Sequence, residues 1–157
     1  MSRPPRIHGF NYKGPYRYLL TFCTHLRRHI FLDDCAAAET LARFRITATE
    51  HQFAILAYCL MPDHVHLLVE GLSAQSDLLR FVPIGKQRAA YSYSKATGGS
   101  RLWQEGFHDR SLRRDNDIKA TARYVLENPV RAGLAISPQD YKYCGSDVWT
   151  IEDILSA

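Results

Sequence analysis

Several features that would assign this chain to a common class are missing from its sequence. The four cysteines (Cys23, Cys35, Cys59 and Cys144) show no C-x-x-C spacing, which argues against a zinc knuckle or a thioredoxin-type site. Reduced thiols in a cytosol fit this pattern best. No apolar run approaches the roughly 18 residues of a membrane-spanning helix, and no signal peptide is visible at the N-terminus. Internal repeats and low-complexity segments are also absent, so we expect a cytoplasmic protein with no membrane partner.

The composition is that of an ordinary globular domain. The chain has 157 residues, of which 46% are hydrophobic, enough for one proper core. We therefore expect a single domain over 1–157, with an irregular lead-in at 1–15 and a tail at 135–157. The formal net charge of +4 is mildly basic. It favours phosphate-bearing partners without identifying one.

The stretch Tyr58–Glu70 is predicted to form two strands joined by a tight turn. One face of the second strand is apolar: Val65, Leu67 and Val69. His64 and His66 then lie side by side on the other face, with Cα atoms about 6.6 Å apart at about 3.3 Å per residue. Two imidazoles at that spacing can bind one divalent ion. A pair of exposed strand histidines is an equally simple interpretation of this stretch alone.

The periodicity of apolar residues predicts the order β-α-β-β-α-β, followed by another helix. The expected strands lie at about 16–24, 53–61, 64–70 and 102–109, and the expected helices at about 34–51 and 77–95. This is the order of the ferredoxin-like (RRM-like) split βαβ arrangement, an α+β fold. Both of these helices pack on one face of the sheet, which leaves the other face free for a site.

The last helix is predicted to carry a tyrosine on its polar side and to end before Pro129. Three residues can cap its start: Asp115, Asn116 or Asp117. Its apolar stripe consists of Ile118, Ala122, Val125 and Leu126. Tyr124 lies about 145° from the centre of that stripe, and Asn128 is its neighbour one turn later. The structural alternatives are an amphipathic tyrosine at a helix edge and an asparagine that caps a short helix over 129–132.

Three segments, in this order along the chain, resemble the motifs of a known family: MPDHVHLLV at 61–69, LWQEGF at 102–107 and ARYVLENPVRAGL at 122–134. With them the chain resembles the IS200-like Y1 transposases, which are HUH enzymes, and among these most closely the REP-associated tyrosine transposases. The resemblance extends from about residue 16 to residue 143. The His-hydrophobic-His motif is weak alone and strong when joined to the Tyr-x-x-x-Asn-Pro-Val helix.

The resemblance implies a metal-dependent single-stranded DNA endonuclease and strand transferase that acts in DNA transposition through a 5′-phosphotyrosine intermediate. Tyr124 would be the nucleophile, and His64 and His66 would bind Mg²⁺ or Mn²⁺. Asn128 occupies the position of the family's third ligand, which is a glutamine in many relatives. The implied partner is single-stranded or hairpin DNA. The implied setting is the bacterial cytoplasm, in association with the nucleoid, and the implied state is a monomer or homodimer.

Basic side chains near the predicted site are candidates for contacts with the DNA backbone: Lys86, Arg88, Arg101, Arg110, Arg113 and Arg114. Three aromatic residues could stack on bases: Tyr91, Tyr93 and Trp103. Ordinary solvation is the alternative for each charge, and Trp103 can instead belong to the core. His108 lies near the end of the expected fourth strand and is assigned no role.

Two other functions compete with this one. A histidine-triad nucleotide hydrolase would need a third histidine at position 68, where Leu68 stands. A non-catalytic, domesticated protein that binds hairpin DNA would share the fold and the basic surface without turnover. The presence of His64, His66 and Tyr124 together favours the enzyme, because a protein that only binds need not keep all three.

Overall fold

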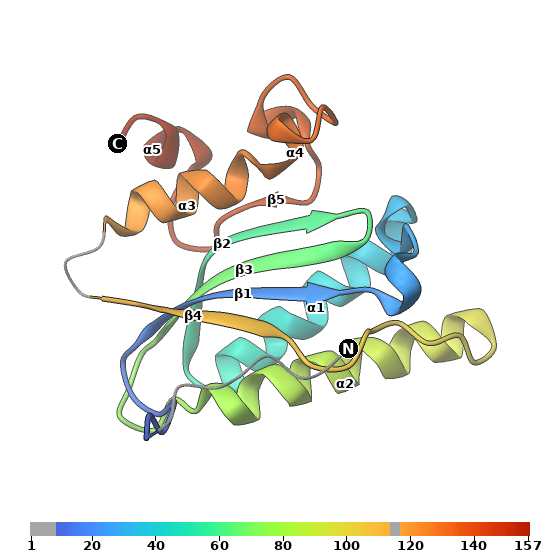
Figure 1. Ribbon diagram of the computed structural model, residues 1–157, viewed down its shortest axis with the longest axis horizontal. Coiled ribbons are helices and arrows are strands. Elements are labelled where there is room, and N and C mark those ends of the chain that lie inside the picture. Colours follow the sequence, from blue (N-terminus) through green and yellow to red (C-terminus); the bar gives the residue numbers. More distant parts are fainter. Residues whose placement is uncertain (1–8, 114–116) are drawn as a thin grey trace.

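The computed structural model of the chain describes residues 9–113 and 117–157. Its centre is an antiparallel five-stranded sheet in the order β4-β1-β3-β2-β5 (Figure 1). The strands are β1 (Arg17–Cys23), β2 (Phe53–Met61), β3 (His64–Gly71), β4 (His108–Leu112) and β5 (Cys144–Gly145). The first four follow the ferredoxin-like order, so the predicted α+β fold is confirmed.

Two long helices, α1 (Asp34–Glu50) and α2 (Leu78–Thr97), cover one face of this sheet (Figure 1). Each is preceded by an N-cap aspartate, Asp33 or Asp77, whose carboxylate accepts a hydrogen bond from a backbone amide of the first turn. The helices approach closely at Gly85, where a Cβ atom would lie 2.6 Å from the Phe44 ring. Short 3₁₀ turns join β1 to α1: η1 (His25–Arg27) and η2 (Ile30–Leu32).

Three shorter helices lie on the opposite face: α3 (Ile118–Leu126), α4 (Asn128–Arg131) and α5 (Ile151–Leu155) (Figure 1). The apolar stripe of α3 forms a second core with Leu68 of β3 and Cys59 of β2. The sequence led us to expect that this face is free. It is in fact partly covered, because the stripe on α3 must be buried against something apolar.

Two segments differ from their predicted structure. The fourth strand begins at His108 rather than near 102, because Leu102, Trp103 and Phe107 are buried in the first core instead of continuing the ladder. The expected tail at 135–157 holds η3 (Pro138–Asp140), β5 and α5. Ile154 of α5 is fully buried in the second core, which fixes this segment against α3. No helix within the described ranges is long and apolar enough to cross a membrane.

Candidate active site

The two histidines of β3 face one another on the sheet face that carries α3. The ladder pairs His66 with Thr21 of β1 and with Cys59 of β2. Opposed residues of neighbouring strands project from the same face, so these three side chains form one row. The Nε2 atoms of His64 and His66 are 3.1 Å apart, and the two rings are nearly perpendicular, at 88°. The hairpin therefore brings both imidazoles to one point.

Each imidazole is oriented by a partner on its other nitrogen. His64 Nδ1 lies 2.7 Å from Asp63 Oδ1, and His66 Nδ1 lies 3.1 Å from Thr21 Oγ1. Partial burial acts to raise the pKa of Asp63, but hydrogen bonds from His64 and Arg27 hold it below its usual value. The ionised carboxylate accepts a hydrogen bond from His64 Nδ1–H, and in the neutral imidazole this tautomer carries its lone pair on Nε2. Metal-binding histidines are commonly oriented by such a partner.

The geometry of the pair fits a divalent cation. Two bonds of about 2.1 Å at a right angle place their donor atoms about 3.0 Å apart, close to the observed 3.1 Å. Burial lowers the pKa of His66 to about 4, and the charges of His64 and Arg131 act in the same direction. His66 is therefore neutral at pH 7, the form that binds metal. Among the described residues, no three His, Cys, Asp or Glu side chains are placed to share an ion.

Tyr124 borders a small hollow beside the histidine pair. The N-cap of its helix is Asp117, whose carboxylate accepts from two backbone amides, whereas the candidates Asp115 and Asn116 lie outside the described residues. The Tyr124 side chain is 52% exposed. It lines a cavity of about 330 Å³ with residues of β1 and β4: Leu19, Thr21, His108, Asp109 and Arg110. Because Thr21 also contacts His66, the tyrosine and the histidines border one region of the sheet.

His108 is part of this region although the sequence assigned it no role. It pairs with Thr21 across the β1–β4 ladder, and Thr21 pairs with His66 across the β1–β3 ladder. His108 and His66 therefore project from the same face, two strands apart. This placement depends on the register of β4 against β1. The sequence analysis could not give that register, because it placed the start of the strand near residue 102 instead of at His108.

Asn128 lies where α3 ends and α4 begins. Its Nδ2 donates hydrogen bonds to the carbonyl oxygens of Tyr124 and Val125, at 3.4 and 3.2 Å. Helix α4 starts at Asn128 itself and is preceded by Glu127, so the prediction that Asn128 caps a helix over 129–132 is wrong. With Nδ2 directed at α3, the amide oxygen is the atom left for a cation.

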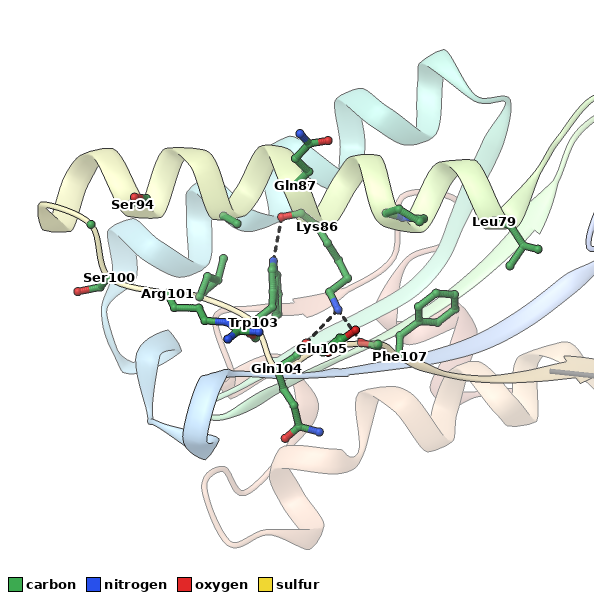
Figure 2. Close-up of a pocket in the computed structure, with 15 residues that line it drawn as sticks. Leu79, Lys86, Gln87, Ser94, Ser100, Arg101, Trp103, Gln104, Glu105 and Phe107 are labelled. Atoms are coloured by element: carbon green, nitrogen blue, oxygen red, sulfur yellow. Dashed lines mark hydrogen bonds between the residues drawn. The ribbon is translucent and has the colours of Figure 1, made fainter. Parts of the chain in front are cut away.

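Lys86 is half-buried and Trp103 is buried, and both lie between α2 and the segment before β4. Lys86 Nζ donates to the carbonyls of Gln104 and Gly106, at 3.2 and 2.5 Å, and Trp103 Nε1 donates to the Lys86 carbonyl (Figure 2). Both residues line a cavity of about 790 Å³ between α2 and the segment 99–107. Burial lowers the pKa of Lys86 to about 8. Lys86 therefore ties the segment before β4 to α2.

Replacing Lys86 should reveal this burial in the pH dependence of stability. Between about pH 8 and 10.5 the unfolded chain keeps the lysine proton while the native protein releases it, so wild-type stability rises with pH. We expect the free energy of unfolding of wild type, relative to Lys86→Met, to increase by on the order of 1–2 kcal/mol from pH 7.5 to 10.5. Urea unfolding at several pH values measures it. Lys95→Met, at an exposed lysine of α2, is the control. A constant difference would contradict the prediction.

The candidate arginines are spread over several surfaces. Arg110 lines the Tyr124 cavity. Arg88 donates to Glu50 and Thr47 of α1, which holds it on the other side of the sheet. Arg101 Nε donates to the Trp103 carbonyl at 3.1 Å. Arg113 is exposed just beyond β4, and Arg114 lies outside the described residues. Arg110 is thus a member of this set that shares a hollow with the tyrosine.

The fold and the site define a class of protein: a ferredoxin-like sheet with a histidine pair and a tyrosine-bearing helix on the same face. The family model for IS200-like transposases matches residues 14–128. The chain belongs to this family.

The chain is also similar to individual known proteins. A Haemophilus influenzae protein described as a REP-associated tyrosine transposase is 26% identical over 143 residues, which is 80% of this chain and 77% of that protein. A solved REP-associated tyrosine transposase bound to a REP hairpin shares the fold, with a TM-score of 0.74 and 21% identity over 92% of this chain and 82% of that one. A transposase crystal structure from Deinococcus radiodurans has a TM-score of 0.55, with 24% identity over 80% of this chain and 97% of that one.

Proposed function

We propose that this protein nicks and rejoins single-stranded, hairpin-bearing DNA, with Tyr124 as the nucleophile. The observation that carries the proposal is that α3 and β1 line the same cavity. Tyr124 of α3 lines it, and Thr21, which also lines it, contacts His66 of the convergent histidine pair. Family membership supports a DNA substrate.

The reaction follows from the chemistry of a phenol and a phosphodiester. The Tyr124 hydroxyl oxygen attacks phosphorus, the bond from phosphorus to the 3′ oxygen breaks, and the phenol proton is balanced by one taken up at the leaving oxygen. The products are a 5′-phosphotyrosine link and a free 3′-OH. Attack by another 3′-OH reverses the step and rejoins strands without ATP, because the energy of the phosphodiester is kept in the covalent intermediate.

His64, His66 and Asn128 are the proposed ligands of Mg²⁺ or Mn²⁺. Such an ion, when bound, polarises the scissile phosphate. Asp63 and Thr21 hold the two imidazoles with their Nε2 atoms converging, so the chain contributes a preformed pair of nitrogen donors. Two imidazoles are soft ligands for Mg²⁺, and we expect Mn²⁺ to give the higher activity.

The second candidate function is hairpin-DNA binding without cleavage. It draws support from the solved REP-associated transposase, which is described as bound to a REP hairpin and shares this fold. The two functions predict the same affinity for DNA and differ in whether a covalent product forms.

Incubation with labelled DNA distinguishes the two functions. We expect wild-type protein with Mn²⁺ and a hairpin-bearing single strand to form an adduct that resists SDS. Label placed downstream of the cut should migrate with the protein, and label placed upstream should be released with a free 3′-OH, since the phosphate stays on the 5′ side of the downstream strand. A chelator should abolish the adduct. If hairpin substrates bind but give no adduct in Mg²⁺ or Mn²⁺, the binding-only function replaces the proposal.

A further inference from the structure

Arg131 makes a set of contacts with Tyr124 that neither the family match nor the proposed reaction assigns. Its guanidinium carbon lies 4.1 Å from the centre of the Tyr124 ring. Its Nη2 donates a hydrogen bond of 2.6 Å to the backbone carbonyl of Tyr124. One side chain therefore holds both the ring and the main chain of the same tyrosine.

The break between α3 and α4 makes this contact possible. In an uninterrupted helix the Cα atom of Arg131 would lie about 10.5 Å along the axis from that of Tyr124. Here α3 ends at Leu126 and a new helix starts at Asn128, with Pro129 in its first turn. Carbonyl groups at the end of α3 then need side-chain donors, and the Tyr124 carbonyl accepts from both Arg131 and Asn128.

Ion pairing does not account for the position of Arg131. Its Nη1 lies 3.7 Å from Oε2 of Glu127, and both side chains are about two-fifths exposed. An exposed pair at that distance contributes little. The hydrogen bond to the Tyr124 carbonyl, at 2.6 Å, is the shorter and better-directed contact, and the guanidinium also lies over the Tyr124 ring. A guanidinium suits both contacts because it is planar with donors at its edge.

We propose that Arg131 is a positioning residue for Tyr124, which holds the ring by stacking at the hollow that Tyr124 lines with Thr21. The expected effect on DNA cleavage rests on the proposed function. The effect on the mobility of the Tyr124 ring does not, because it can be measured without DNA. Loss of the stack should free the ring, and displacement of a reacting group by about 1 Å can lower a rate by about 100-fold.

The test compares Arg131→Gln and Arg131→Lys with two matched controls. Arg43→Gln removes an arginine of α1 that also pairs with a glutamate four residues away, and its side chain is 41% exposed, like that of Arg131. Glu127→Gln removes the carboxylate near Arg131 while leaving the stack. Order parameters of ring-labelled tyrosine report the mobility of Tyr124 in the free protein, with its signals assigned through Tyr124→Phe.

We expect Arg131→Gln to increase the mobility of the Tyr124 ring and to slow adduct formation at saturating DNA by about 10- to 100-fold. Hairpin affinity and thermal stability should stay near wild type, because Arg131 is exposed. Arg131→Lys keeps the cation but not the planar fork, so it should recover part of the rate. Both control variants should behave as wild type.

Two results would overturn the positioning role: an equally ordered Tyr124 ring in Arg131→Gln, or an adduct rate within twofold of wild type. An equal loss of rate in Arg43→Gln would show a general charge effect and would also overturn it. If wild type forms no adduct while Arg131→Gln still frees the ring, the proposed reaction fails and the holding of Tyr124 by Arg131 stands.

Discussion

Tyr124→Phe is expected to abolish the covalent DNA adduct and to keep hairpin affinity within about threefold. Phenylalanine lacks the oxygen that would attack phosphorus, and it retains the ring on which Arg131 stacks, 4.1 Å from the centroid. The hydroxyl lies off the buried stripe of α3, since the Tyr124 side chain is 52% exposed. The fold should therefore be unchanged. Adduct formation is measured on SDS gels with DNA labelled downstream of the cut, and affinity by fluorescence anisotropy.

Other tyrosines provide the controls for this experiment. Tyr91 is 63% exposed on α2, so Tyr91→Phe removes an accessible hydroxyl on the helix-covered side and should leave the adduct unchanged. Tyr141 is less suited to attack, because its hydroxyl donates to the Leu60 carbonyl at 2.8 Å and burial raises its pKa to about 12. Adduct formed by Tyr124→Phe at the wild-type rate would transfer the nucleophile role to one of the remaining tyrosines, including Tyr93.

His64→Ala and His66→Ala are each expected to lower the rate of adduct formation by at least about 100-fold. Each removes one of the two nitrogen donors that converge to 3.1 Å, and a single imidazole holds Mn²⁺ or Mg²⁺ weakly. Calorimetric titration of the DNA-free protein with Mn²⁺ should show the loss of affinity directly. This second measurement separates a failure of metal binding from a failure of DNA cleavage.

The fold should survive these substitutions because neither imidazole belongs to the first core, which takes Val65, Leu67 and Val69 from the same strand. Thermal unfolding of both variants should stay close to wild type. His51→Ala changes a histidine that follows α1 instead, and it should retain full activity. If either active-site variant cleaves normally in chelator-treated buffer with added Mn²⁺, the two-histidine metal site is wrong.

The local sequence determined the elements and the family. A period of two residues in β3 separates its histidines from the core, and a period of 3.6 residues in α3 separates Tyr124 from the buried stripe. Both patterns depend on backbone geometry within a few residues, so they can be predicted without knowing what packs against them. The predicted strands near 53–61 and 64–70 agree with β2 and β3 within a residue.

Tertiary structure alone decided how these elements meet. The start of β4 depends on the burial of Trp103 beneath α2, which shifts the strand toward the C-terminus and places His108 opposite Thr21. The burial of Lys86 depends on a segment about 20 residues away in the chain that supplies two carbonyls. These outcomes are set by which apolar surfaces and which unpaired carbonyls come together from distant parts of the chain.

The contact between Arg131 and Tyr124 illustrates the same limit. Both residues lie in the segment 122–134 that the sequence singles out, and the end of the helix before Pro129 was predicted. That the Arg131 guanidinium lies over the Tyr124 ring and donates to its carbonyl was not, because this depends on how the chain turns between α3 and α4. Periodicity reports which face of an element is apolar. It does not report how a chain turns at a break or which side chain satisfies the exposed backbone there, because that choice is made by packing and hydrogen bonding in three dimensions.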